Sequence, residues 1–145
     1  MARKTRTQIL GLGGQRIGEP FTAAVNLSTH QYKVVKSGSV TGEVNLATGA
    51  SNPTGLGVLL NAPTAGQQAL VVSQGYTTAI GRGAACNLTY GKFVVVASDA
   101  LLEPVATAAG SPVFGKWLGA SQTAGASAQG TVLLFGFTAC HVAAS

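Results

Sequence analysis

The chain has 145 residues and a formal net charge of +5, and its charged residues make up 9%, against about 25% in an average soluble protein. Hydrophobic residue types account for 46%, which excludes the disordered class. Four acidic residues, two His and two Cys supply little material for paired carboxylates or a metal site. We therefore expect no enzyme, no catalytic residue, no metal and no cofactor.

Residues 1–19 predict an extended basic arm that ends at Gly18-Glu19-Pro20, because the residue before proline is pushed out of helical conformations. The segment has no sustained apolar period, and four cations against Glu19 leave it a net charge of +3. We expect the free arm to be poorly ordered and to bind a partner. Its predicted contacts are the cations Arg3, Lys4, Arg6 and Arg16 and the apolar anchors Ile9, Leu10, Leu12 and Ile17.

Residues 20–145 predict a single β-rich domain, in which short runs of β-branched and aromatic residues alternate with Gly, Pro, Asn and Ser about every ten residues. Such a series is typical of an all-β fold, a compact β-barrel or sandwich-like domain. The expected strands are Phe21–Leu27, Tyr32–Lys36, Val40–Leu46, Leu56–Leu60, Ala69–Ser73, Tyr76–Ile80, Lys92–Ala97, Val113–Leu118 and Thr131–Phe137.

Two of these runs, Phe93–Val96 and Val132–Phe135, are continuously apolar rather than alternating, which predicts strands covered on both faces. One cover would be the core and the other a neighbouring subunit. Only Ser98–Leu102 and Thr107–Ala109 show weak helical character, and nearby prolines keep any helix short. Helix is therefore expected to be a minor component.

A weak internal repeat joins Gly57–Gly66 with the following run Ala69–Val72, and Gly115–Gly125 with Thr131–Phe135. Both segments read as a strand, an Ala-rich turn that closes on Ala-Gly, and a second strand. A structural duplication and two unrelated hairpins both explain this pattern.

Several short motifs resemble nucleotide-binding loops or a catalytic triad, but their flanking residues do not fit these sites. Gly11–Arg16 has Arg where a dinucleotide-binding loop needs Gly or Ala, and Gly110–Lys116 lacks both the hydroxyl residue and the helix of a phosphate-binding loop. Cys86, Asp99 and His141 have no flanking residues typical of a catalytic triad. We expect Cys86 to lie in the core, with a disulfide to Cys140 as the alternative.

Aromatic residues and sequons have plain structural interpretations. Trp117, Phe114, Phe135 and Phe137 predict a hydrophobic cluster in the core or at a subunit interface. His30 and His141 are expected at the surface or an interface. The sequons Asn26-Leu27-Ser28 and Asn87-Leu88-Thr89 are interpreted as chance matches, because no secretion signal precedes them.

Residues 44–81 and 117–145 contain no charged side chain, and such surfaces are poorly protected against association. We expect them to be partly buried between subunits of a homotrimer. Polar residues interrupt both stretches, so neither predicts a membrane span. Nucleic-acid binding is also unlikely as a role, since no basic stripe with interleaved aromatic residues is present.

The chain resembles the small β-rich capsid decoration, or cement, proteins of tailed bacteriophages. The residues that carry this resemblance are Thr54–Leu60, Ala65-Gly66, Ala69–Val72, Gly91–Val96, Phe114–Leu118 and Gly125–Phe135. Members of that family alternate a strand, a small-residue turn and a valine-rich strand twice over. Lys116-Trp117 in the second copy and the long basic arm depart from the family pattern.

The resemblance implies a β-tulip-like domain with a structural role in the virion. It implies binding to the outer surface of the mature head, where trimers clamp neighbouring major capsid protein subunits, after assembly in the host cytoplasm. A tail protein or another phage structural β-module is an alternative with the same composition. A small nucleic-acid-binding module that uses the basic arm is a third possibility.

Overall fold

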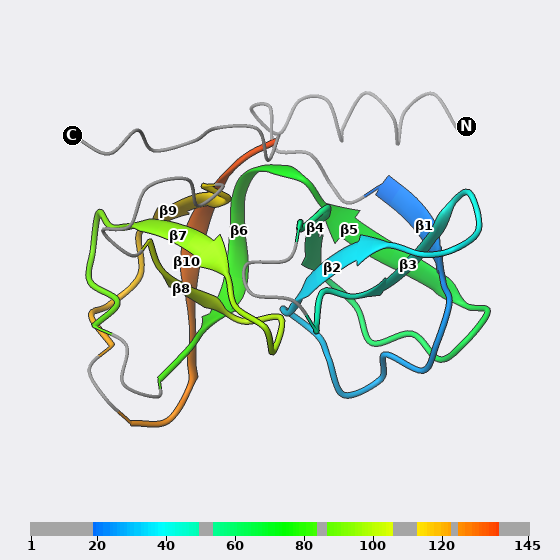
Figure 1. Ribbon diagram of the computed structural model, residues 1–145, viewed down its shortest axis with the longest axis horizontal. Helices are drawn as coiled ribbons and strands as arrows, with labels where there is room; N and C mark the ends of the chain where they lie inside the picture. The colour runs from blue at the N-terminus through cyan, green and yellow to red at the C-terminus, as the bar shows by residue number, and fades with distance from the viewer. Residues whose placement is uncertain (1–18, 50–53, 84–86, 106–112, 123–124, 137–145) are drawn as a thin grey trace, which may run out of the picture.

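The computed structural model describes residues 19–49, 54–83, 87–105, 113–122 and 125–136. These residues form ten strands and no helix, which confirms the all-β prediction. The strands make two closed five-stranded barrels that lie side by side along the long axis of the molecule (Figure 1). The predicted arm, apart from Glu19, lies outside the described residues, and so do residues 137–145.

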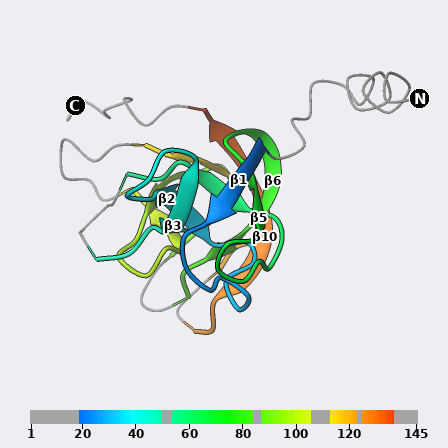
Figure 2. The same ribbon diagram turned by 90° about the vertical axis from the view of Figure 1, so that its right-hand side faces the viewer.

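The first barrel has the strand order β1-β3-β2-β4-β5, and β5 closes it onto β1. The pair β1 and β3 is parallel, and every other neighbouring pair is antiparallel. Figure 2 views this barrel from its free side, with β6 and β10 of the other barrel behind it. Its strands are β1 (Glu19–Ala23), β2 (Val34–Ser37), β3 (Glu43–Leu46), β4 (Gly57–Leu59) and β5 (Gln68–Val72).

The second barrel repeats this topology strand for strand. Its order is β6-β8-β7-β9-β10, β10 closes it onto β6, and the pair β6 and β8 is again the parallel one. Ser73 alone separates β5 from β6, so the two barrels follow each other without a linker. The strands are β6 (Gln74–Gly81), β7 (Phe93–Val96), β8 (Leu102–Pro104), β9 (Gly115–Trp117) and β10 (Ala128–Phe135).

Backbone hydrogen bonds set the two barrels in the same register. In the first barrel the Tyr32 N–H donates to the Leu59 carbonyl (2.7 Å), and in the second the Gly91 N–H donates to the Trp117 carbonyl (2.8 Å). Both donors have positive φ, 67° at Tyr32 and 83° at Gly91. Leu59 and Trp117 therefore occupy equivalent positions, and residues can be matched from strand to strand.

Of the two explanations for the weak internal repeat, the structure supports duplication. The segments that matched are the hairpins β4–β5 and β9–β10. The sequons interpreted as chance matches belong to the same duplication, since Asn26-Leu27-Ser28 precedes β2 and Asn87-Leu88-Thr89 precedes β7. Leu27 and Leu88 are both completely buried, and the N–H of each donates to the loop that leads out of the β4 or β9 strand.

Glycine begins β4 and β9 for the same steric reason. A Cβ added at Gly57 would lie 2.4 Å from the Val72 carbonyl oxygen, and one added at Gly115 would lie 2.4 Å from that of Leu133. Real Cβ atoms do not approach backbone oxygens so closely. The duplicated glycine therefore lets the fourth strand of each barrel lie close against the fifth.

Two hydrophobic clusters fill the molecule. The first barrel encloses its own cluster: Ala23, Leu27, Val35, Val44, Leu59, Ala69 and Val71. The second cluster fills the other barrel and continues into the contact between the barrels, where Val34, Ala47, Val58 and Val72 of the first barrel join it. The two barrels thus share the second cluster. They are also joined by the bridge between Thr48 and Asp99 and by the hydrogen bond from the Ile80 N–H to the Tyr32 carbonyl.

The helical character expected for Ser98–Leu102 is wrong. Ser98–Leu101 form a turn in which Ala100 has a φ of 64°, and Leu102 begins β8. The Ala97 N–H bonds the Leu101 carbonyl across this turn, so the chain reverses rather than coils. Thr107–Ala109, Cys86 and Cys140 lie outside the described residues.

Nine expected strands correspond to real ones, with shifted ends, and β8 was not expected. β1 ends at Ala23 instead of Leu27, β3 begins at Glu43 instead of Val40, and β10 begins at Ala128 instead of Thr131. Within the chain Val94–Val96 are all buried, whereas Phe93 is exposed, so the cover of its face by a neighbouring subunit stays a prediction. Along β10 only Val132 and Leu134 are buried, whereas Leu133 and Phe135 are half-buried.

Candidate interaction surface

Among the described residues, no group of three or more His, Cys, Asp or Glu side chains could hold a metal ion. Asp99 and Glu103 instead bind Arg82, at 3.2 and 2.9 Å, and both ion pairs are partly exposed. This cluster joins the end of β6 to β8 and to the turn that contacts the first barrel. Asp99 thus has a structural contact in the fold, while Cys86 and His141 lie outside the described residues.

His30 is half-buried in the connection between β1 and β2, and its Nδ1 atom is buried without a hydrogen-bond partner. Burial, followed by the nearby charge of Lys33, lowers the pKa of His30 below its ordinary value of 6.5. Both causes disfavour the imidazolium form. His30 is therefore a neutral structural residue near neutral pH rather than a fully exposed one.

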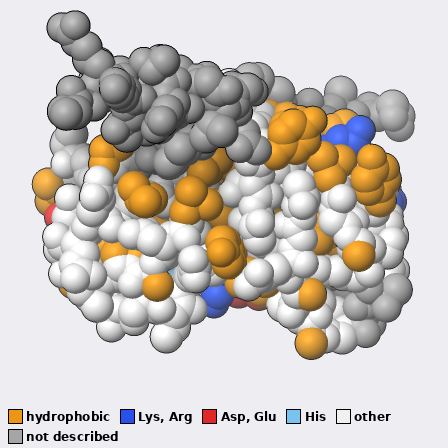
Figure 3. Space-filling model, turned by 180° about the vertical axis from the view of Figure 1, so that it is seen from behind, with side chains coloured by type: hydrophobic (Ala, Val, Ile, Leu, Met, Phe, Trp, Pro, Cys, Tyr) orange, Lys and Arg blue, Asp and Glu red, His pale blue; other side chains and the backbone are white. Residues whose placement is uncertain are grey.

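An open row of side chains crosses the outer face of the second barrel, formed by Tyr76, Phe93, Lys116 and Leu133. The strand registers place Phe93 opposite Lys116, Lys116 opposite Leu133, and Leu133 opposite Tyr76. Phe93 is 47% exposed and Tyr76 is 57% exposed. Figure 3, which views the molecule from behind, shows hydrophobic side chains beside a cationic one over the second barrel.

Phe93 stands at one end of this open row and makes two ring contacts there. Its ring makes an edge contact with the half-buried ring of Phe135, with 6.1 Å between centroids. The Lys116 ammonium lies 5.7 Å from the Phe93 centroid, within the range of a cation–π interaction. These contacts fix an aromatic side chain at the surface, and aromatic residues are enriched where proteins bind each other.

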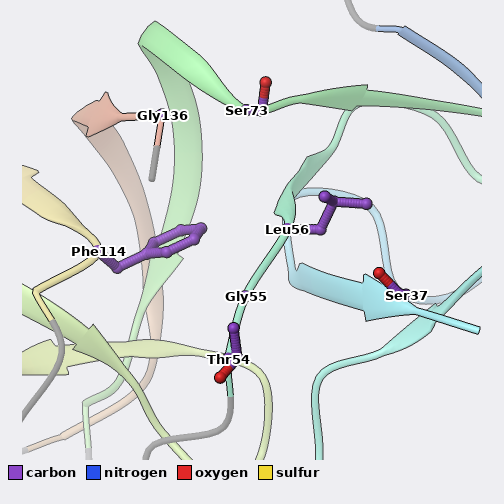
Figure 4. A pocket seen from close by; sticks show the side chains of 7 residues that line it. All are labelled: Ser37, Thr54, Gly55, Leu56, Ser73, Phe114 and Gly136. Carbon is purple, nitrogen blue, oxygen red and sulfur yellow. The ribbon is translucent and has the colours of Figure 1, made fainter. Parts of the chain in front are cut away.

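A hollow of about 180 Å³ lies where the two barrels meet, beside the first barrel. Its lining residues are Ser37, Thr54, Gly55, Leu56, Ser73, Phe114 and Gly136. Figure 4 shows the Phe114 ring reaching from the second barrel toward Gly55 and Leu56. The hollow holds no titratable side chain, so its lining suits an apolar or hydroxyl-bearing group rather than a charged ligand.

The residues predicted to form an aromatic cluster do not stay together. Phe114 and Trp117 are buried in the shared core, and the Trp117 indole N–H donates to the Ala120 carbonyl (3.0 Å). Phe135 lies instead on the outer face against Phe93. Phe137 and the predicted arm contacts lie outside the described residues; these contacts are Arg3, Lys4, Arg6, Ile9, Leu10, Leu12, Arg16 and Ile17.

Two members of the open row, Phe93 and Tyr76, were missed. The run that begins at Phe93 was interpreted as covered on both faces, and Tyr76 was placed in an expected strand without any expectation for its faces. The duplication could have revealed Phe93. Once Asn26-Leu27-Ser28 is aligned with Asn87-Leu88-Thr89 and a gap of two residues is placed after Thr89, Val34 of the first copy falls opposite Phe93, and a large aromatic replaces a small β-branched residue. Such a replacement at equivalent positions indicates different surroundings.

The fold and its surfaces define a class of protein: a tandem duplication of a five-stranded barrel, in which the described residues include no group of His, Cys, Asp or Glu side chains that could hold a metal ion. None of those residues belongs to a helix that could cross a membrane. Neither a protein-family model nor the sequence of a curated protein matches the chain.

Among the solved structures with a similar fold is the N base of the head fiber protein gp8.5 of bacteriophage phi29. The TM-score is 0.56 at 17% sequence identity, and the alignment covers 86% of this chain and 98% of that chain. The similarity therefore spans nearly the whole of the phi29 domain and extends over both barrels of this chain. At this level of identity it establishes a common fold.

Proposed function

We propose that the protein is a non-enzymatic structural component of a bacteriophage virion that binds the outer surface of the head. The observation that carries this proposal is the fold shared with the head fiber base of phi29 over 86% of the chain. The low charge content and the resemblance to decoration proteins support the same role.

In this proposal the protein clamps neighbouring major capsid protein subunits as a homotrimer. The folded barrels dock first, and the basic arm of residues 1–19 then binds a neighbouring subunit at high effective concentration. Because the protein binds the assembled lattice and not its free subunits, docking stabilises the head against disassembly. No cofactor, nucleic acid or membrane takes part.

A deletion of residues 2–17 tests the clamp. We expect the truncated chain to fold, to bind heads much more weakly, and to protect them less against heat, because the arm contributes both apolar and charged contacts. Adding salt to the full-length protein should reproduce only part of this loss, since salt screens the cations and not the apolar anchors. Binding to purified heads that lack the protein is measured by co-sedimentation, with electron cryomicroscopy to locate it.

Equal occupancy and equal protection by the truncated chain would contradict the role of the arm. Failure of the full-length chain to bind heads, or its location at the tail, would overturn the proposed site on the head.

The fold also favours a second candidate, because the similar phi29 domain is the base of a head fiber. Under this alternative the two barrels anchor a projecting fiber and do not stabilise the lattice. Heads without the protein would then lose a projecting feature and keep their resistance to heat. Heads that lack a clamp would instead become less resistant, so one preparation distinguishes the two functions.

A further inference from the structure

The two barrels present equivalent faces to different surroundings. In the first barrel Val34, Val58 and Val72 form a covered row, in which Val34 lies opposite Val58 and Val58 opposite Val72. They are 1%, 0% and 3% exposed. Their burial is expected, since they belong to the hydrophobic cluster that continues into the second barrel.

The positions equivalent to the covered row in the second barrel are those of the open row. Because Leu59 and Trp117 are equivalent, Val58 corresponds to Lys116, and the strand registers then match Val34 with Phe93 and Val72 with Leu133. No described part of the chain covers this face of the second barrel as the second barrel covers the first. One face of the repeated unit is thus occupied in one copy and open in the other.

The cover of the first row comes from one end of the second barrel. The Val34 N–H donates to the Ala100 carbonyl (2.9 Å). A Cβ added at Gly55 would lie 2.7 Å from both Phe114 and Val34 and 3.1 Å from Val96, so these side chains close around Gly55. The row is therefore covered by one end of a barrel. This end consists of the turn between the second and third strands and the start of the fourth strand.

The first barrel has the same end, and the described residues leave it open. In the first barrel the Gly38 N–H donates to the Glu43 carbonyl (2.8 Å), and in the second the Ala97 N–H donates to the Leu101 carbonyl (2.8 Å). Glu43 and Leu101 therefore occupy equivalent positions. Leu56 in the same way corresponds to Phe114. This end includes the exposed Ser37 and the hollow between Leu56 and Ser73.

We propose that the open row of the second barrel binds the end of the first barrel of a second copy of this chain. The contact repeats between chains the packing already present within one chain. Phe93 would fill the hollow beside Leu56. Lys116 would face Glu43, which forms no ion pair with any described residue and neighbours the Ser37 turn. The aromatic ring of Phe93 thus meets the hollow, and the Lys116 ammonium meets the Glu43 carboxylate.

The contact is heterologous, because each copy contributes a row on one side and a barrel end on the other. Heterologous contacts generate rings when they close and filaments when they do not. A ring of three copies would produce the homotrimer proposed above. The inference does not require the head as a partner, and it can be tested on the isolated protein.

Sedimentation of the full-length chain over a range of concentrations tests the contact. We expect reversible association, and we expect Phe93→Glu to weaken it by about 30-fold or more, the range of an interface hot spot. Val25→Glu is the matched control, since Val25 is an exposed apolar residue of the first barrel outside both surfaces, and it should leave association unchanged. Trp117 fluorescence reports whether each variant is folded.

A charge exchange identifies the two surfaces. Lys116→Glu and Glu43→Lys should each weaken self-association, because each places like charges together. Mixing the two variants should restore it, because the row of one then meets the end of the other with opposite charges. No loss in Phe93→Glu, or no restoration on mixing, would overturn the proposal. So would a full-length chain that stays monomeric at every concentration, because another partner or segment would then occupy the row.

Discussion

Two equivalent pairs of residues in the two barrels divide the same space differently. The first barrel has the pair Leu59 and Ala69, and the second has Trp117 and Gly130. Leu59 and Trp117 are both completely buried. A Cβ added at Gly130 would lie 2.3 Å from Cζ2 of Trp117, so the indole occupies the space that Ala69 fills in the other barrel. The large residue was accommodated by loss of a methyl group across the strand pair.

This exchange predicts energetic coupling between the two positions. Gly130→Ala should destabilise the protein by about 2 kcal/mol through overpacking, and Trp117→Leu by about 3 kcal/mol through a cavity. The double variant recreates the Leu and Ala pair, so its loss should fall short of the sum by about 1 kcal/mol or more. Urea denaturation followed by circular dichroism measures all three. Strictly additive losses would show that the pair does not share this space.

His30 predicts a pH dependence of stability. Because burial lowers its pKa in the folded protein, the unfolded chain binds more protons around pH 6.5, and stability should fall as the pH drops below the ordinary value of 6.5. The loss should continue until the pH passes the lowered pKa of the folded state. Chemical denaturation from pH 8 to 5, for the wild type and His30→Gln, isolates this contribution. Identical pH profiles would contradict it.

At the scale of the elements, each barrel depends on a strand pair that only glycine permits. β4 and β5, and equally β9 and β10, approach so closely that a methyl group at Gly57 or Gly115 would meet a carbonyl oxygen. Neither glycine needs a positive φ, so the requirement is space rather than backbone conformation. The same constraint in both copies explains why this residue persists although the neighbouring side chains differ.

Gly57→Ala and Gly115→Ala should therefore both destabilise the fold, each by about 2 kcal/mol or more, because a strand must move to relieve the contact. Gly66→Asn is a suitable control, since nothing lies within 4 Å of an added Cβ there and asparagine tolerates its φ of 80°. Thermal unfolding compares the three variants. A midpoint unchanged by either alanine would mean that the barrel adjusts at no cost.

For the whole molecule, the shared hydrophobic cluster predicts that the two barrels unfold as one unit. Val58 belongs to the first barrel yet packs in the cluster of the second. Val58→Ala should cost about 2 kcal/mol and lower the unfolding midpoint by several degrees. The single tryptophan, Trp117, reports on the second barrel, and its fluorescence midpoint should fall together with that of the circular dichroism signal.

Val25→Ala, at an exposed site of the first barrel, should change neither signal. Two separate transitions, with the Trp117 midpoint unaffected by Val58→Ala, would show instead that each barrel is stable by itself.

The sequence alone determined that the protein is all-β and where nine of the ten strands in the described part of the chain run. Alternating β-branched residues and regularly spaced turn residues are local signals, and they require no knowledge of the partner strand. β8 was missed because Glu103 and Pro104 interrupt its apolar run, whereas the equally short β4 and β9 lie within longer apolar runs. The same local signals suggested the repeat of β4–β5 and β9–β10 without deciding whether it was a duplication.

Only the tertiary structure decided how the strands pair into two barrels and which faces remain open. Val34 and Phe93 begin similar valine-rich runs at equivalent positions, and yet one is buried and the other exposed. No local pattern separates them, because the difference comes from the barrel end that packs on Val34 from residues more than sixty positions away. Burial on the second face of a strand is a property of long-range contacts, which composition and periodicity do not contain.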